Sequence, residues 1–185
     1  SMAGHFNNMR SFALGDESAL LMASWPNGRP KIPFTYFSEV MTGFEYTAAV
    51  GMIYEGMENE GLNVIKNIRD RYNGVKRSPF DEAECGHHYA RVMASWASVL
   101  AITGFHYSVI DKTMKMNARP GKWFWSNGYS WGTVDIQKNG SKYNVELNVL
   151  FGKLAVEKFE LAGVGTFKVE TSSIIEEGNL LQFEI

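Results

Sequence analysis

The stretch KRSPFDEAECGHHYARVMASW, residues 76–96, separates two unlike halves of the sequence. Between Asp81 and Arg91 it carries three acids, one cysteine, two histidines and one arginine, the densest group of chemically active side chains in the chain. Before it, apolar residues recur at helical spacing, and after it they alternate as in strands. We therefore predict an α+β fold in which helices come first, this stretch forms a loop that feeds a last helix, and strands follow.

The first half predicts two helices joined by a short connection. Apolar residues at Met41, Phe44, Ala48 and Met52 indicate a helix from residue 38 or 42 to about residue 56. A second apolar face predicts a helix that Asn59 caps and a glycine at 74 ends. Such helices should be antiparallel neighbours, with charged residues such as Arg71 on a solvated face. We also expect a short helix over residues 16–25 with Asp16 as its N-cap, and a later helix ended by a glycine at 104.

The second half predicts antiparallel strands connected by hairpins. Alternation is clear from Tyr143 to Val149, and Asn139-Gly140 is a strong signal for a tight hairpin turn. Six strands are expected, over residues 122–126, 129–137, 141–151, 154–161, 165–171 and 180–185. The predicted organisation is a cloning remnant at residues 1–4, a helical segment at 5–108 and a β-rich region at 109–185.

The composition excludes few kinds of protein. The net charge of −2 gives no reason to expect nucleic acid or an anionic membrane as partner. No apolar run approaches the ~20 residues of a membrane helix, so no integral membrane segment is expected. The single cysteine excludes an internal disulfide framework. No signal peptide is visible, which favours a cytoplasmic location, although we expect the natural N-terminus to lie upstream.

Three charged residues are the main candidates for a binding site. One loop contains three acids within four positions, Asp81, Glu82 and Glu84. They lie too close together to flank a substrate from two sides, so they are better placed to bind one. Alternatively, they only stabilise the start of the following helix through its dipole. Arg91 can pair with an acid from another helix, Glu45 being the first choice, bind a ligand hydroxyl, or remain solvated. Glu45 lies beside an apolar stripe, so it must be paired or solvated at the edge.

The same stretch leaves weaker alternatives open. Glu84, Cys85, His87 and His88 are possible metal ligands, but adjacent ligands strain tetrahedral geometry, and the remaining histidines are isolated. Cys85 as a nucleophile is disfavoured because nearby acids discourage ionisation of the thiol. We expect no cofactor.

The tail contains a group of aromatic residues that suits either a sugar-stacking platform or a strand core. The group consists of Trp123, Trp125, Tyr129 and Trp131. Aromatic stripes on strands more often belong to the core.

Several segments resemble the C-terminal part of the catalytic domain of glycoside hydrolase family 116, which includes bile-acid β-glucosidase (non-lysosomal glucosylceramidase) and bacterial relatives. The matching words are FALGDESALLMASWP (12–26), EVMTGFEYTAAVGMIYEGM (39–57), EGLNVIKNIRDRYNG (60–74) and SPFDEAECGHHYARVMASWA (78–97). The resemblance covers residues 10–106. The tail resembles those of some bacterial members more weakly, through FWSNGYSWGTV (124–134).

The resemblance implies the last helices of an (α/α)6 toroid from a retaining β-glycosidase. The family's glutamate nucleophile and aspartate acid/base have no counterpart in this sequence, so no catalytic residue is assigned. Glu82 and Arg91 match residues that contact hydroxyls of the bound glucose, and Glu45 matches an acid that braces the arginine.

The predicted function is therefore a fragment that supplies binding residues for a β-glucoside-like substrate and is inactive alone. A non-catalytic carbohydrate-binding module, with the tail tryptophans exposed in a row, is the alternative. A metalloprotein built on Cys85, His87 and His88 is a third. Because an incomplete toroid exposes apolar helix faces, self-association is also expected.

Overall fold

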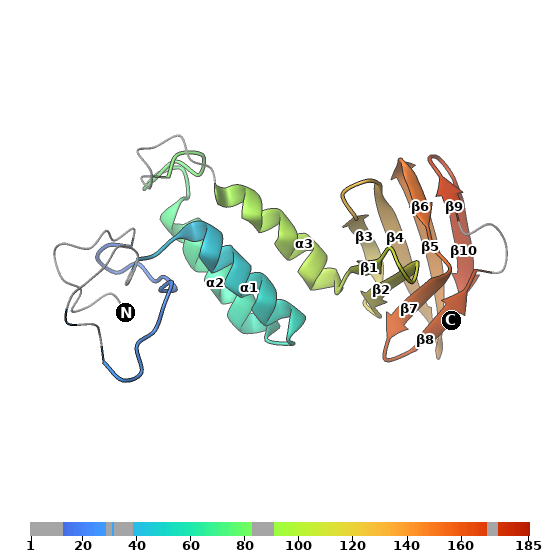
Figure 1. Ribbon diagram of the computed structural model, residues 1–185, viewed down its shortest axis with the longest axis horizontal. Helices are drawn as coiled ribbons and strands as arrows, with labels where there is room; N and C mark the ends of the chain where they lie inside the picture. Colours follow the sequence, from blue (N-terminus) through green and yellow to red (C-terminus); the bar gives the residue numbers. More distant parts are fainter. Residues whose placement is uncertain (1–12, 29–30, 32–38, 83–90, 170–173) are drawn as a thin grey trace. The chain divides into compact units, whose positions relative to one another are not determined.

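The computed structural model describes residues 13–28, 31, 39–82, 91–169 and 174–185 (Figure 1). The described part is mixed α+β, with helices before strands, as the sequence predicts. The chain forms two compact units, Ser1–Ser98 and Val99–Ile185. No helix in the described residues is long and apolar enough to cross a membrane.

Helices α1 (Thr42–Tyr54) and α2 (Glu58–Arg71) form an antiparallel pair in the first unit, as predicted (Figure 1). Tyr46, near the start of α1, is buried in one cluster with Ile68, near the end of α2. At the other end of the pair, a Cβ on Gly61 would lie 2.6 Å from Cγ1 of Ile53. A larger residue at 61 would therefore push the two helices apart.

The predicted helix ends are right for α1 and slightly wrong for α2. Thr42 begins α1, and Gly56, at a φ of 82°, lets the chain turn back after it. Helix α2 begins at Glu58 with Met57 as its N-cap, so the prediction of Asn59 as the cap is wrong.

The short helix predicted over residues 16–25 is absent from the described segment 13–28, which contains turns and extended chain. Its backbone groups are used elsewhere. The Leu20 amide donates to Glu45 Oε1 at 2.8 Å, and the Ser18 carbonyl accepts from Arg71 Nη1 at 2.6 Å. These tertiary bonds satisfy the groups that a helix would have paired internally.

The helix after the acidic loop begins as a 3-10 helix, η2 (Arg91–Ser95), and continues as α3 (Trp96–Thr103). It ends where predicted, at Gly104, whose φ of 62° suits glycine. The residues that precede it, 83–90, lie outside the described part of the chain.

Within its described residues, 99–169 and 174–185, the second unit contains two four-stranded sheets and a two-stranded one. The first sheet has the order β1-β2-β7-β8, made of His106–Ser108, Thr113–Asn117, Lys158–Ala162 and Gly165–Lys168. The second has the order β10-β5-β4-β3, made of Leu180–Glu184, Lys142–Phe151, Trp131–Asn139 and Gly121–Ser126. Strands β6 (Lys153–Ala155) and β9 (Ile174–Glu176) form the two-stranded sheet.

The core of the second unit lies between the inner faces of the two larger sheets. The predicted alternation in β5 is confirmed, since the side chains of every second residue from Tyr143 to Val149 are buried. Phe183 of β10 meets Phe159 of β7 edge to face, with centroids 5.1 Å apart, and stacks on Phe167 of β8 at 4.3 Å. These aromatic contacts join the two sheets across the core.

One pairing departs from the predicted antiparallel arrangement. Strand β2 pairs with β7 in parallel, with Thr113 opposite Lys158. The segment predicted as one strand over 154–161 is interrupted at residues 156–157, where the Glu157 amide donates to the Lys112 carbonyl at 2.7 Å. The chain therefore passes from β6 into a different sheet at this point.

The predicted hairpin between β4 and β5 exists, but its turn is shifted by one residue. Asn139 pairs with Lys142, which leaves Gly140 and Ser141 as the two turn residues. Gly140 has a φ of 62° and Ser141 is not in the positive-φ region, the pattern of a type II′ turn. Asn139 is therefore the last strand residue and not the first turn residue.

Candidate functional site

The first turn of α1 is where the three predicted binding residues meet. The Thr42 hydroxyl donates a hydrogen bond to the buried carboxylate of Glu82. The next residue, Gly43, lies against Arg91, because a Cβ built there would be 3.1 Å from Cδ of Arg91. Glu45 belongs to the same turn. Glu82 and Arg91, which lie far from α1 in the sequence, thus contact the same helical turn that contains Glu45.

Arg91 lines a cavity on the side of α1. The cavity has a volume of about 340 Å³ and is lined by Gly43, Phe44, Thr47, Arg91, Met93 and Ala94. The guanidinium carbon of Arg91 lies 6.0 Å from the centroid of the half-exposed Phe44 ring, a cation–π distance. The cavity therefore presents hydrogen-bond donors beside an aromatic surface.

Glu45 has a different partner from the one predicted. Its carboxylate pairs with Arg71, not Arg91, and both side chains are 1% exposed. The other oxygen accepts from the Leu20 amide. Burial raises the pKa of the Glu45 carboxyl above its ordinary value, while Arg71 and the Leu20 amide oppose that rise. Of the two alternatives left open for Glu45, pairing is confirmed and a solvated edge is wrong, and the solvated face predicted for Arg71 is wrong as well.

The antiparallel pairing of α1 and α2 explains this outcome. In such a pair, the first turn of one helix lies beside the last turn of the other, so Glu45 faces Arg71. Burying the Glu45 carboxylate without a partner would cost several kcal/mol of folding free energy. The guanidinium of Arg71 on the neighbouring helix offsets that cost by pairing with it. The pair could have been found in the sequence by matching charges at opposite ends of the two predicted helices.

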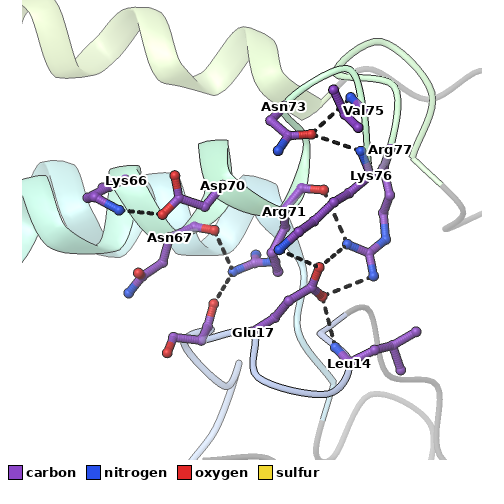
Figure 2. Close-up of polar contacts among 11 residues, drawn as sticks. Leu14, Glu17, Lys66, Asn67, Asp70, Arg71, Asn73, Val75, Lys76 and Arg77 are labelled. Atoms are coloured by element: carbon purple, nitrogen blue, oxygen red, sulfur yellow. Dashed lines mark hydrogen bonds and ion pairs between the residues drawn. The ribbon is translucent and has the colours of Figure 1, made fainter.

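A second ion-pair cluster, which the sequence analysis missed, ties residues 14–17 to the end of α2 (Figure 2). Arg77 donates from Nη1 and Nη2 to the two oxygens of Glu17, at 2.6 and 3.0 Å. Glu17 also accepts from the Leu14 amide at 2.9 Å, and Arg77 donates to the Arg71 carbonyl at 3.1 Å. The Arg77 guanidinium holds the pKa of Glu17 below its ordinary value. Glu17 thus serves the tertiary structure and not the helix first predicted there.

Only the beginning of the acidic loop belongs to the described residues. Glu84, Cys85, His87 and His88, the candidate metal ligands, fall in residues 83–90, outside the described part. Asp81 lies in a turn, its amide donating to the Ser78 carbonyl at 3.4 Å. Within the described ranges, no group of three or more His, Cys, Asp or Glu side chains is arranged to hold a metal ion.

The tail aromatic residues do not form the exposed row that the carbohydrate-binding alternative requires, and the strand core that their pattern favoured is confirmed for Trp125. Trp125 is fully buried and lies 6.4 Å, between ring centroids, from Phe105 in the core. Trp123 is partly buried, and its Nε1 donates to the Arg119 carbonyl at 2.8 Å. Tyr129 and Trp131 are exposed. A stacking surface made of all four residues is therefore wrong, because Trp123 and Trp125 share the side of the sheet that faces the core.

No protein-family model matches the chain, and no curated protein matches it. The assignment of a function accordingly depends on the residues described above and on the resemblance carried by the sequence words.

Proposed function

We propose that the helical unit is the sugar-binding part of a retaining β-glycosidase, within an (α/α)6 toroid of the family-116 type. The substrate would be a β-glucoside or a close relative. The observation that carries the proposal is the convergence of Glu82 and Arg91 on the adjacent residues Thr42 and Gly43. A carboxylate and a guanidinium supported by one helical turn form a suitable pair for adjacent hydroxyls of one sugar.

The chemistry of the two side chains is complementary. Glu82 accepts hydrogen bonds from hydroxyls, and Arg91 donates to them from a rigid, planar fork. The Thr42 hydroxyl orients the Glu82 carboxylate by donating a hydrogen bond to it. The Phe44 ring beside Arg91 supplies an apolar surface for the C–H groups of a sugar ring.

Glu45 has a positioning role in this proposal. Through Arg71 and the Leu20 amide it joins α1, α2 and residues 18–20. This arrangement fixes the first turn of α1, and that turn places Thr42 against Glu82 and Gly43 against Arg91. The role that the resemblance implied, bracing Arg91 directly, is replaced by support of the turn that Arg91 packs on.

The reaction itself is assigned to carboxylates outside this sequence. A retaining hydrolase needs a nucleophile and an acid/base about 5–5.5 Å apart on either side of the glycosidic bond. In the proposal, Glu82 and Arg91 contribute by hydrogen bonds to hydroxyls that strengthen in the transition state. The 185-residue chain alone would bind but not hydrolyse.

Hydrolysis of p-nitrophenyl β-glucoside by the natural gene product tests the proposal. The natural product should hydrolyse it, the 185-residue chain should not, and Glu82→Gln or Arg91→Lys should lower kcat/KM about 100-fold, or ~2.7 kcal/mol. Lys66→Ala is the matched control, because Lys66 is exposed on α2 and should leave kcat/KM unchanged. An inactive natural product, hydrolysis by the short chain, or unchanged kinetics in both site variants would each reject the proposal.

A further inference from the structure

The outer face of the sheet β10-β5-β4-β3 carries a continuous row of exposed aromatic rings. Phe124 of β3 and Trp131 of β4 are each 41% exposed, and Phe151 of β5 is 52% exposed. Ring centroids lie 6.4 Å apart between Phe124 and Trp131, and 6.2 Å apart between Trp131 and Phe151. Three strands thus contribute to one aromatic row on the side of the sheet away from the core.

A local irregularity of the sheet produces this row. The register shifts between Trp131 and Gly132, so that Trp131 pairs with Phe151; a regular ladder would have placed Leu150 there. The close approach of the strands at this point requires glycine, since a Cβ on Gly132 would lie 1.8 Å from the Asn148 carbonyl oxygen. The bulge therefore brings two large rings together at one edge of the face.

Polar side chains occupy the middle of the same face, and two exposed leucines, Leu150 and Leu180, also lie on it. Directly opposed residues of neighbouring strands share a face, and the pairs here are Thr133 with Asn148, Asp135 with Glu146, and Gln137 with Asn144. Beyond the rings lies a hollow of about 430 Å³, to which this face contributes Gln137, Asn144, Glu146 and Gln182. The Gln182 amide donates to the Glu146 carboxylate in this hollow.

This combination of side chains suits the two kinds of surface that a sugar presents. Aromatic rings pack against flat, weakly polar faces, as the C–H face of a pyranose is. Hydroxyl groups both donate and accept; amides such as Gln137 and Asn144 do the same, and carboxylates accept.

Other partners fit the face less well. The acids of this face are largely balanced, since Lys142 pairs with Glu184 and Lys122 lies directly opposite Asp135. The face therefore lacks the basic patch that would bind the phosphates of a nucleic acid or an anionic membrane. The centre of a protein–protein interface is depleted in charged residues, whereas here acids and amides occupy the middle of the sheet.

We infer that this face binds a neutral oligosaccharide. One sugar stacks on the Phe124–Trp131–Phe151 row, and the hydroxyls of a further sugar bond in the polar hollow. From Trp131 to Gln137 the face extends about 20 Å along β4, at ~3.3 Å per residue, so the ligand spans more than one ring. This second site does not depend on the proposed site on α1.

Binding of cellohexaose, laminarihexaose and mannohexaose to the full 185-residue chain, followed by isothermal titration calorimetry, tests the inference. At least one of them should bind, and Trp131→Ala should weaken that binding about ten-fold or more (~1.4 kcal/mol), because it removes the central ring of the row. Trp131→Phe should retain most of the affinity, which separates loss of stacking from loss of folding. Asn144→Ala should weaken the hexasaccharide and leave the matching disaccharide unchanged.

All titrations use a chain carrying Arg91→Ala, which disables the β-glucoside site proposed on α1, so that the binding measured belongs to this face. In that chain, Trp96→Ala removes another exposed tryptophan, from α3, and should leave hexasaccharide binding unchanged. Failure of all three glycans to bind, or binding that Trp131→Ala leaves intact, would overturn the inference. The inference would also be overturned if the chain bound no glycan and sedimentation showed a dimer that dissociates in Trp131→Ala, because the face would then bind a second copy.

Discussion

The interiors of the two units are stabilised by different kinds of interaction. In the described part of the first unit, the buried apolar cluster consists of Tyr46, Ile68 and Tyr72, and the residues buried around it include Glu45, Arg71 and Glu82. In the second, fifteen buried apolar residues form one continuous cluster between two sheets. The helical unit thus buries an ion pair beside a small apolar cluster, whereas the sheet unit buries a large apolar volume. The two should therefore respond to opposite kinds of substitution.

The largest effect is expected from Arg71→Met in the helical unit. The variant leaves the Glu45 carboxylate buried without its cation, which should cost about 3–5 kcal/mol of unfolding free energy. Urea unfolding followed by the helical circular-dichroism signal measures it. The double variant Glu45→Leu/Arg71→Met should recover most of the loss, because it removes both charges. If the single variant unfolds at the wild-type midpoint, the pair does not hold this unit together.

A volume change should have the next largest effect, in the sheet unit. Leu147→Ala removes a fully buried side chain from the middle of β5 and should cost about 3 kcal/mol through lost burial and a cavity. Urea unfolding followed by tryptophan fluorescence reports it, since Trp125 lies in the same cluster. Asn144→Ala, on the outer face of the same strand, is the control and should change stability by less than about 0.5 kcal/mol. Equal losses in the two variants would mean that burial does not distinguish the two faces of β5.

The same difference explains which features the sequence predicted. Helices α1 and α2 and strand β5 follow from spacing within a dozen residues, and each was found close to its observed bounds. The parallel pairing of β2 with β7 joins segments some forty residues apart, and no local alternation reveals such a partner. The helix predicted over residues 16–25 is absent because of similarly distant contacts. Glu45 accepts from the Leu20 amide, and Arg71 donates to the Ser18 carbonyl, so these backbone groups are paired outside the segment.

The candidate site was predicted in part. The concentration of charge after residue 76 led to Glu82 and Arg91, and the structure brings both to the first turn of α1. The partner of Glu45 was missed because residue type favours a solvated arginine at the end of a helix, and only the antiparallel packing buries Arg71. The exposed ring row was missed because alternation in β3 does not say which face is the core.

The Glu17–Arg77 pair, intermediate in burial, should show a smaller, pH-dependent effect. The pKa of Glu17 is lowered in the folded state, so its stabilisation is present above the ordinary carboxyl value of 4.5 and is lost as pH falls through the lower folded value. Buried hydrogen bonds to charged groups contribute about 1.5–3 kcal/mol, and partial exposure of this pair places it at or below the lower end of that range. Glu17→Gln should therefore be less stable than the wild type at pH 7, and the gap should close below pH 4.5. Thermal unfolding of both chains from pH 7 to 3 measures this gap; a constant gap would show that the Glu17 charge has no part in it.

The smallest effect is expected at Lys66, in the same helix as Arg71 (Figure 2). Lys66 pairs with Asp70 one turn later, but the two side chains are 69% and 56% exposed. Water screens such a pair, which contributes about 0.3–0.5 kcal/mol, and alanine returns part of that through its helix propensity. Lys66→Ala should therefore leave the urea midpoint almost unchanged at low and at high salt. A loss above about 1 kcal/mol would mean that charge pairing stabilises α2 without burial, and the contrast between Arg71 and the surface of its own helix would disappear.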